Sequence, residues 1–183
     1  MTIWFSSDHH FHHERIIQYQ NRPFHHVTEM NEKLVELHNE CVKPSDHWYC
    51  LGDVTILRDN QGRGLNILRR MNGHKRLILG NHDHYAIKHY VEHFEKVMAM
   101  NVIDSMRFIH IPVHPMSFGG VKACVHGHIH QQPAPKPVIY VDKDGKVGVK
   151  PYINICVEVT NYKPVSLEEI KKMVAKAIAE AEG

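Results

Sequence analysis

The fold is decided by residues 2–10, which read TIWFSSDHH. Thr2–Ser6 is a short apolar run, and a run of this kind predicts a buried β-strand. Asp8 and His10 follow it directly, so this strand delivers a carboxylate and an imidazole to one place. Loops at the carboxyl ends of strands are where α/β proteins build their sites. This stretch therefore predicts a strand and a site together.

The same arrangement, an apolar run followed by potential metal ligands, occurs three more times. The runs are His47–Leu51, Arg76–Leu79 and Lys122–Val125, and the segments after them are residues 52–53 (GD), 80–83 (GNHD) and 127–130 (GHIH). Residues i and i+2 of an extended backbone point the same way. We therefore expect Asp8 with His10, and His128 with His130, to converge on metal ions. One such segment occurs by chance in many proteins, whereas four in this order form a specific signal.

Amphipathic segments alternate with these strands and predict helices. Glu29–Val42 has its apolar residues on one face, with Thr28 as the expected N-cap and Pro44 as the stop. Further helices are expected at Leu65–Met71, Tyr85–Phe94 and Ser166–Ala181, the last opened by a Ser166…Glu169 capping box. Later strands are expected at Val97–Asp104, Met106–His110, Val138–Val141, Lys146–Val149 and Tyr152–Val159, with a hairpin turn at Asp144-Gly145. The order predicts one α/β domain over residues 1–183, with two packed sheets and helices outside.

Composition excludes several classes of protein. The 183 residues are 43% apolar and 23% charged, as in an ordinary globular protein, and the net charge of +2 gives no strong nucleic-acid signal. No apolar stretch is long enough to span a membrane, and residues 1–10 do not resemble a signal peptide. The four cysteines form no C-x-x-C pair, which favours free thiols and a cytoplasmic location. The unusual number is 18 histidines, since histidine is the commonest metal ligand.

Taken together, the four segments resemble those of the calcineurin-like metallophosphoesterase family, and the resemblance runs through most of the chain. Residues 7–13, SDHHFHH, are similar to the Ser-Asp-x-His-Phe-Gly-His opening of the small single-domain bacterial and phage members. Residues 21–24 (NRPF), 29–31 (EMN) and 162–165 (YKPV) are also similar. The resemblance implies a four-layer α/β/β/α sandwich of two mixed β-sheets flanked by helices. It also implies an enzyme that hydrolyses phosphoester bonds.

The resemblance assigns the ligands to two divalent metal ions. The implied ligands are Asp8, His10 and His130 for the first metal, Asn81, His128 and one further histidine for the second, and Asp53 as the bridge.

The further histidine is open between two positions. The family usually supplies it from a His-x-Pro segment after a strand, and His110-Ile111-Pro112 fits. His114 lies four residues on and can also reach the site. We favour His110 as the ligand, with His114 near the substrate.

Several residues are expected to act on the substrate. The resemblance implies that His82 lies beside the phosphate, where it stabilises charge or protonates the leaving oxygen, and that Asp83 orients it. Arg22 and His13 are further candidates for contact with phosphate, because a guanidinium matches phosphate with its planar fork. His12 stands where the closest relatives often have glycine, and a side chain there is expected to narrow the site or to change substrate choice.

These residue types suit phosphoester hydrolysis. Two metals neutralise the phosphate, orient it and lower the pKa of a bridging water, whose hydroxide form attacks phosphorus. Imidazole and carboxylate ligands favour manganese, iron, nickel, zinc or cobalt over calcium or magnesium, and manganese is placed first. The expected substrate is a small phosphoester, by preference a nucleotide-derived phosphodiester.

Two other functions compete with the enzyme. A non-catalytic interaction module on the same scaffold would lack several ligands or the catalytic histidine, and here the whole candidate set is present. A structural zinc protein would use closed four-ligand sites, usually with cysteine, and the cysteines here lie outside the motifs.

Overall fold

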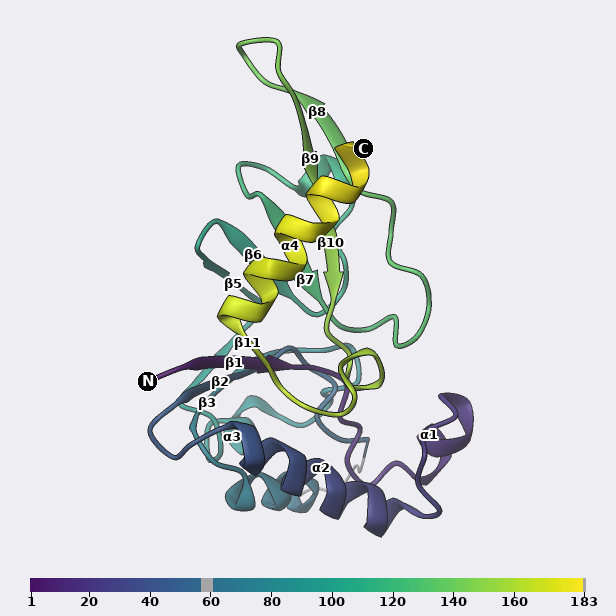
Figure 1. Cartoon of the computed structure of the whole chain (residues 1–183). Coiled ribbons are helices and arrows are strands. Elements are labelled where there is room, and N and C mark those ends of the chain that lie inside the picture. Colours follow the sequence, from purple (N-terminus) through teal and green to yellow (C-terminus); the bar gives the residue numbers. More distant parts are fainter. Residues whose placement is uncertain (57–60, 183) are drawn as a thin grey trace.

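The computed structural model describes residues 1–56 and 61–182, and a five-stranded mixed sheet lies at its centre (Figure 1). The strand order is β11-β1-β2-β3-β4. The last four of these run parallel, whereas β11 pairs antiparallel with β1 at the edge. The strands are β1 (Ile3–Ser6), β2 (His47–Cys50), β3 (His74–Ile78), β4 (Lys96–Met98) and β11 (Val165–Ser166). Because β1, β2 and β3 are parallel neighbours, the segments that follow them leave the sheet at one edge.

A second mixed sheet has the order β10-β7-β6-β5. Strands β10, β7 and β6 are parallel, and β5 is antiparallel to β6. The strands are β5 (Met100–Ile103), β6 (Met106–Ile109), β7 (Ala123–His126) and β10 (Tyr152–Asn154). The chain passes from β4 in the first sheet to β5 in the second through Ala99 alone. The expected single strand Val97–Asp104 is therefore wrong, since it is two strands in different sheets.

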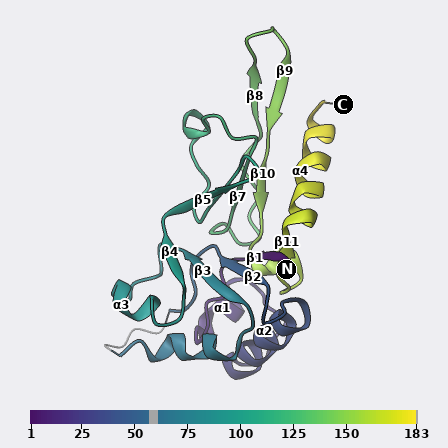
Figure 2. The same ribbon diagram turned by 90° about the vertical axis from the view of Figure 1, so that its left-hand side faces the viewer.

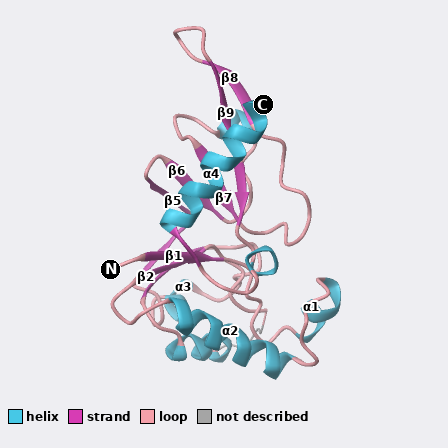
Figure 3. Cartoon of the chain, in the orientation of Figure 1, coloured by secondary structure: helices cyan, strands magenta, loops and turns pink. Residues whose placement is uncertain are grey.

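Helices cover the face of the first sheet that points away from the second (Figures 2 and 3). One buried cluster joins Met30 and Leu34 of α2, Leu68 of η1, and Trp48 and Leu77 of the sheet. The helices are α1 (Glu14–Tyr19), α2 (Val27–Cys41), α3 (Ile87–Tyr90) and α4 (Leu167–Glu182), with the 3₁₀ segments η1 (Arg63–Arg70), η2 (Pro115–Ser117) and η3 (Val157–Thr160).

A second apolar cluster lies between the two sheets and fixes their mutual position. The ring of Phe5 on β1 stacks on Tyr49 of β2, with 5.2 Å between centroids, and on Phe108 of β6, with 4.3 Å. Ile170 and Val174 of α4 belong to the same cluster. The architecture is thus mixed α/β, with two mixed sheets and helices, as predicted at that level.

A two-stranded hairpin extends from the body (Figure 2). It consists of β8 (Val138–Val141) and β9 (Val147–Lys150), which pair antiparallel. Gly145 has a φ of 79° in the turn, which confirms the expected hairpin at Asp144-Gly145.

The helix ends confirm one expected cap and contradict another. The capping box of α4 is confirmed, because Glu169 N–H donates to Ser166 Oγ at 3.2 Å and Ser166 N–H donates to Glu169 Oε2 at 2.8 Å. The expected cap Thr28 is wrong, since α2 begins two residues earlier than expected and His26 accepts the hydrogen bond from Glu29 N–H at 3.1 Å.

Three expected elements are shorter or of another type. The helix expected at Tyr85–Phe94 is only α3, and the one expected at Leu65–Met71 is the 3₁₀ helix η1. The strand expected at Tyr152–Val159 ends at Asn154, whose side-chain oxygen accepts from Cys156 N–H at 3.0 Å and turns the chain into η3.

The four cysteines are free thiols, with Cys50, Cys124 and Cys156 buried and Cys41 partly buried. Within residues 1–56 and 61–182, no helix has the length and apolar character needed to cross a membrane.

Candidate metal centre

The four predicted segments meet where the carboxyl ends of β1, β2, β3 and β7 come together. Asp8 N–H donates to Gly52 O and His10 N–H donates to Asp53 O, both at 3.0 Å. From the second sheet, His128 N–H donates to Asp8 Oδ2 at 2.9 Å. These hydrogen bonds bring segments that are far apart in the chain into one site.

Five predicted ligands have left-handed backbones, with φ of 62° at Asp8, 50° at His10, 54° at Asp53, 71° at His128 and 49° at His130. Residues with a Cβ rarely adopt this conformation, which costs about 1–3 kcal/mol each and clusters at functional sites. The expectation that the pairs Asp8 with His10 and His128 with His130 lie in extended backbone is therefore wrong. Tight turns, not strand alternation, bring the side chains together.

Asp8, His10 and His130 form a first group whose ligand atoms all lie within 4.8 Å of one another. Nε2 of His10 and Nε2 of His130 each lie 3.9 Å from Asp8 Oδ1. The other oxygen of Asp8 accepts from His128 N–H at 2.9 Å and from the Cys156 thiol at 3.2 Å. Among the described residues, Asp8 Oδ1 and both ring nitrogens of His10 are buried without a hydrogen-bond partner.

A second group consists of Asp8, Asp53 and His110. His110 Nδ1 lies 2.7 Å from Leu51 O, and a carbonyl can only accept, so Nδ1 carries the proton. Nε2 of His110 then faces Asp53 Oδ1 at 3.4 Å and Asn81 Oδ1 at 2.8 Å. The ring of His128 lies beside that of His110, with 5.2 Å between centroids.

Asp53 belongs to the second group and also faces His10 of the first. Its Oδ2 is 3.5 Å from His10 Nε2, and its Oδ1 is 3.4 Å from His110 Nε2. Burial alone raises the pKa of Asp53, but the close approach and positive charge of His110 outweigh it and hold the pKa below the usual range. Burial likewise lowers the pKa of His110, and the carboxylates of Asp53 and Asp8 more than offset it, so that the pKa is raised. The site therefore favours a cation between its carboxylates.

The distances and the unpartnered atoms fit metal ions. Two ligands bound about 2.1 Å from one tetrahedral ion lie about 3.4 Å apart, close to the 3.4–3.9 Å separations found here. These separations are too long for good hydrogen bonds. A buried carboxylate oxygen and imidazole without partners are costly unless a cation satisfies them. Both groups can therefore hold a divalent metal.

Comparison with known proteins places the chain in a family. The uncharacterized protein MJ1445 of Methanocaldococcus jannaschii is 35% identical over 177 residues, covering 95% of this chain and 92% of that protein. The chain belongs to the same family as MJ1445. The crystal structure of AQ665 from Aquifex aeolicus, a protein of unknown function, is similar with a TM-score of 0.70 and 26% identity, covering 94% of this chain and 98% of that chain. No family model matches the chain.

The structure distinguishes the two histidines that the sequence left open. His110 is buried in the site, with a relative exposure of 1%. His114 is exposed and accepts from Met116 N–H at 3.3 Å at the start of η2. Only His110 belongs to a ligand group in the described chain.

Two glycines allow the segments to approach so closely. A Cβ on Gly127 would collide with Ser7 Oγ and Asp8 Oδ2. Gly52 has a φ of 95°, and a Cβ there would lie 2.8 Å from His110 Nδ1. Both positions therefore require glycine for the ligands to keep these places.

His82 and Asp83 follow the predicted ligand Asn81, and their side chains make different contacts. The ring of His82 is partly buried and lies 5.7 Å from the ring of His10, measured between centroids. The carboxylate of Asp83 accepts from the backbone N–H groups of Gly80, Asp53 and Val54 at 2.8–3.0 Å. Asp83 was expected to orient the His82 ring. Its carboxylate instead joins the segment after β3 to the segment after β2 through these backbone hydrogen bonds.

The expectation that Arg22 contacts phosphate is wrong. Arg22 has a relative exposure of 4%, and its guanidinium is used inside the protein. It donates to the carbonyls of Asp8 and His9 at 2.7 and 2.8 Å, and it pairs with Glu158 at 2.5 Å. Glu158 was missed, although a single acidic residue within the apolar run of residues 152–159 is a signal that could have found it.

His13 and His12 lie on different sides of their segment. The ring of His13 is 5.6 Å from that of His10, so it borders the site as expected. His12 instead turns toward α2, where its Nδ1 lies 3.1 Å from Asn31 Nδ2. Its φ of 64° explains why glycine suits this position. The side chain of His12 therefore does not narrow the site between the ligands.

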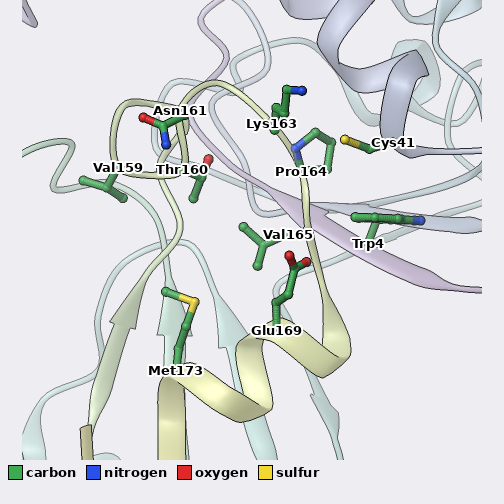
Figure 4. Close-up of a pocket in the computed structure, with 10 residues that line it drawn as sticks. All are labelled: Trp4, Cys41, Val159, Thr160, Asn161, Lys163, Pro164, Val165, Glu169 and Met173. Atoms are coloured by element: carbon green, nitrogen blue, oxygen red, sulfur yellow. The ribbon is translucent and has the colours of Figure 1, made fainter. Parts of the chain in front are cut away.

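A separate surface hollow, drawn in Figure 4, lies between residues 159–165, β1 and α4. Its charged side chains are already paired, because Lys163 Nζ donates to Glu40 Oε2 at 2.9 Å and Glu169 accepts from Ser166. None of its lining residues is a predicted ligand.

Proposed function

We propose that this protein is a dinuclear metal-dependent phosphoesterase of the calcineurin-like type, acting on a small phosphodiester. The observation that carries the proposal is the position of Asp53. Each of its carboxylate oxygens faces the Nε2 of a different histidine, His10 at 3.5 Å and His110 at 3.4 Å. A carboxylate placed in this way between two ligand groups is suited to bridge two cations. Both relatives are described as being of unknown function, so the support comes from the site itself.

The proposed identity also implies the finer fold, a four-layer α/β/β/α sandwich. Two features support it. The sheets share an apolar core that includes α4, and α2 with η1 covers the other face of the first sheet.

The ligands divide between two positions. Asp8, His10 and His130 would hold the first ion, His110, His128 and Asn81 the second, and Asp53 both. When bound, two such ions neutralise phosphate charge, orient the substrate and provide an activated water, and manganese is our first choice.

Residues of the protein would orient the ligands and supply the proton for the leaving group. Leu51 O holds the Nδ1 proton of His110, so its Nε2 lone pair points inward. Asp53 Oδ1 accepts from the backbone N–H of His82 at 2.9 Å, which holds the backbone of His82 beside the ligands. The imidazole of His82, whose ring centroid is 5.7 Å from that of His10, would give a proton to the leaving oxygen. His13 borders the same face as a candidate contact for the phosphate.

The alternative is a non-catalytic interaction module on this scaffold. It is favoured less, because Asp8 Oδ1 and both ring nitrogens of His10 are buried and unpartnered among the described residues, a cost that an interaction surface does not require.

An activity screen tests the proposal. The apo protein is reconstituted separately with Mn²⁺, Fe²⁺, Ni²⁺, Zn²⁺ and Co²⁺ and assayed with an aryl phosphodiester, an aryl phosphomonoester and a panel of cyclic nucleotides. We expect diester hydrolysis that Asp53→Asn abolishes together with metal binding. His82→Asn should retain the metals and lose turnover by about 10²–10⁴-fold. No activity with any metal would favour the interaction module, and normal turnover of His82→Asn would remove His82 from the mechanism.

A further inference from the structure

A buried chain of charged groups lies directly behind the first ligand group. His130 Nδ1 is 2.9 Å from Glu158 Oε1, and the same oxygen accepts from Arg22 Nη2 at 2.5 Å and Nε at 3.0 Å. The side chains of Arg22 and Glu158 both have a relative exposure of 0%. These groups contact the ligands from inside the protein, so solvent and substrate do not reach them.

The hydrogen bond to Glu158 determines which nitrogen of His130 can bind a metal. A carboxylate accepts, so Nδ1 of His130 carries the proton. Nε2 is then left as the lone-pair nitrogen, and it lies 3.9 Å from Asp8 Oδ1. A metal-binding histidine commonly donates its other nitrogen to a carboxylate, which fixes the ring and strengthens the ligand.

The same ion pair also holds the opposite side of the first group. Arg22 donates to the carbonyls of Asp8 and His9, which belong to the left-handed turn that presents Asp8 and His10. The first ligand group is thus fastened at both sides by one buried pair. In the second group, the partner behind His110 is uncharged, namely the carbonyl of Leu51.

We propose that Glu158 is a positioning residue for the first metal, holding His130 with Nε2 toward Asp8 while Arg22 holds Glu158. The inference rests on the metal sites of the proposed function, but it does not depend on the substrate.

The test is a metal titration of the full chain in a double-variant cycle. Glu158→Gln keeps the shape and an acceptor oxygen but removes the charge, and Glu40→Gln makes the same change in an exposed ion pair with Lys163. Mn²⁺ is titrated into apo wild type, Glu158→Gln, His130→Asn, the double variant and Glu40→Gln, with free Mn²⁺ read by electron paramagnetic resonance. Apo unfolding midpoints show whether each variant folds.

We expect Glu158→Gln to weaken one of two Mn²⁺ sites by about 10–100-fold and to leave the other unchanged. In the His130→Asn background the same change should have little further effect, because Glu158 acts through His130. Glu40→Gln should titrate like wild type.

Two results would overturn the inference. One is an unchanged titration of Glu158→Gln. The other is an equal loss with and without His130, which would make Glu158 a general stabiliser of the fold. Normal Mn²⁺ binding by wild type with no hydrolysis would remove the proposed function and leave this inference standing.

Discussion

His38 is a buried histidine outside the two ligand groups, and it should make the stability of the protein depend on pH. Its relative exposure is 1%, and its ring lies edge-on to Trp48, with 4.6 Å between centroids. Nε2 lies 3.0 Å from Asn72 O, while Nδ1 has no partner among the described residues. Protonation would place a charge and an unsatisfied N–H in the apolar core. Burial, and to a lesser extent Lys75, lowers the pKa of His38 to about 4, although Asn72 O opposes this.

The magnitude follows from linkage between protonation and folding. In the unfolded chain the histidine has its ordinary pKa of 6.5, against about 4 in the folded protein. Between these values the unfolded chain binds more protons, so stability is full above pH 6.5 and falls as the pH decreases toward 4. The difference between the two pKa values corresponds to about 3 kcal/mol of folding stability. About 2 kcal/mol of this stability is lost at pH 5.

Urea unfolding of the apo protein with chelator present, at pH 7.5 and pH 5.0, measures this loss. His38→Gln keeps a donor for Asn72 O and removes the titrating group. Between pH 7.5 and pH 5.0, the free energy of unfolding of this variant should therefore fall by about 2 kcal/mol less than that of wild type. His25→Gln, which removes an exposed histidine, is the matched control. Equal losses in wild type and His38→Gln would refute the argument that a neutral His38 is required in the core.

Four further predictions test the fold and the site. Gly127→Ala places a Cβ against Asp8 Oδ2, so Mn²⁺ binding should weaken about tenfold or more while the far-UV circular dichroism is retained, and a wild-type titration would contradict this packing. Phe108→Ala removes the ring that joins the sheets and should lower the free energy of unfolding by about 3–5 kcal/mol in urea. Ser166→Ala removes the cap of α4 and should cost about 1 kcal/mol in the same assay. At position 12, where φ is 64°, His12→Gly should be more stable than His12→Ala by about 1 kcal/mol, and the reverse order would show that this backbone is not left-handed.

The sequence predicted strands well where one apolar run forms one element, as at His47–Leu51. It failed at Val97–Asp104 because β4 and β5 both contact the core, so the change of sheet at Ala99 leaves the apolar pattern unbroken. It also failed at Tyr152–Val159, where the side chain of Asn154 ends the strand through a hydrogen bond that the pattern of apolar residues does not reveal.

The sequence could predict which segments meet at the candidate site because each follows a strand, and the parallel order of β1, β2 and β3 brings those strand ends together. The left-handed turns that carry these residues could not be predicted from sequence. Asp8 and His10 would point the same way in an extended strand too, so their spacing does not distinguish a strand from a turn. The role of Arg22 was misread because its partner Glu158 is 136 residues away. Local sequence does not show which surface a guanidinium faces.

Stability alone does not account for the buried pair of Arg22 and Glu158. Removing two charges from water costs several kcal/mol each, and well-packed apolar residues of similar volume are often as stabilising or more so. Apolar residues cannot donate to the carbonyl of Asp8 or accept the Nδ1 proton of His130, and the ion pair does both. Cys156, two residues before Glu158, donates a hydrogen bond from its thiol to Asp8 Oδ2. This leaves Asp8 Oδ1 available to a cation. Under the proposed function, the pair is best explained by the geometry that it imposes on Asp8 and His130, with its hydrogen bonds offsetting part of the cost of the left-handed turn.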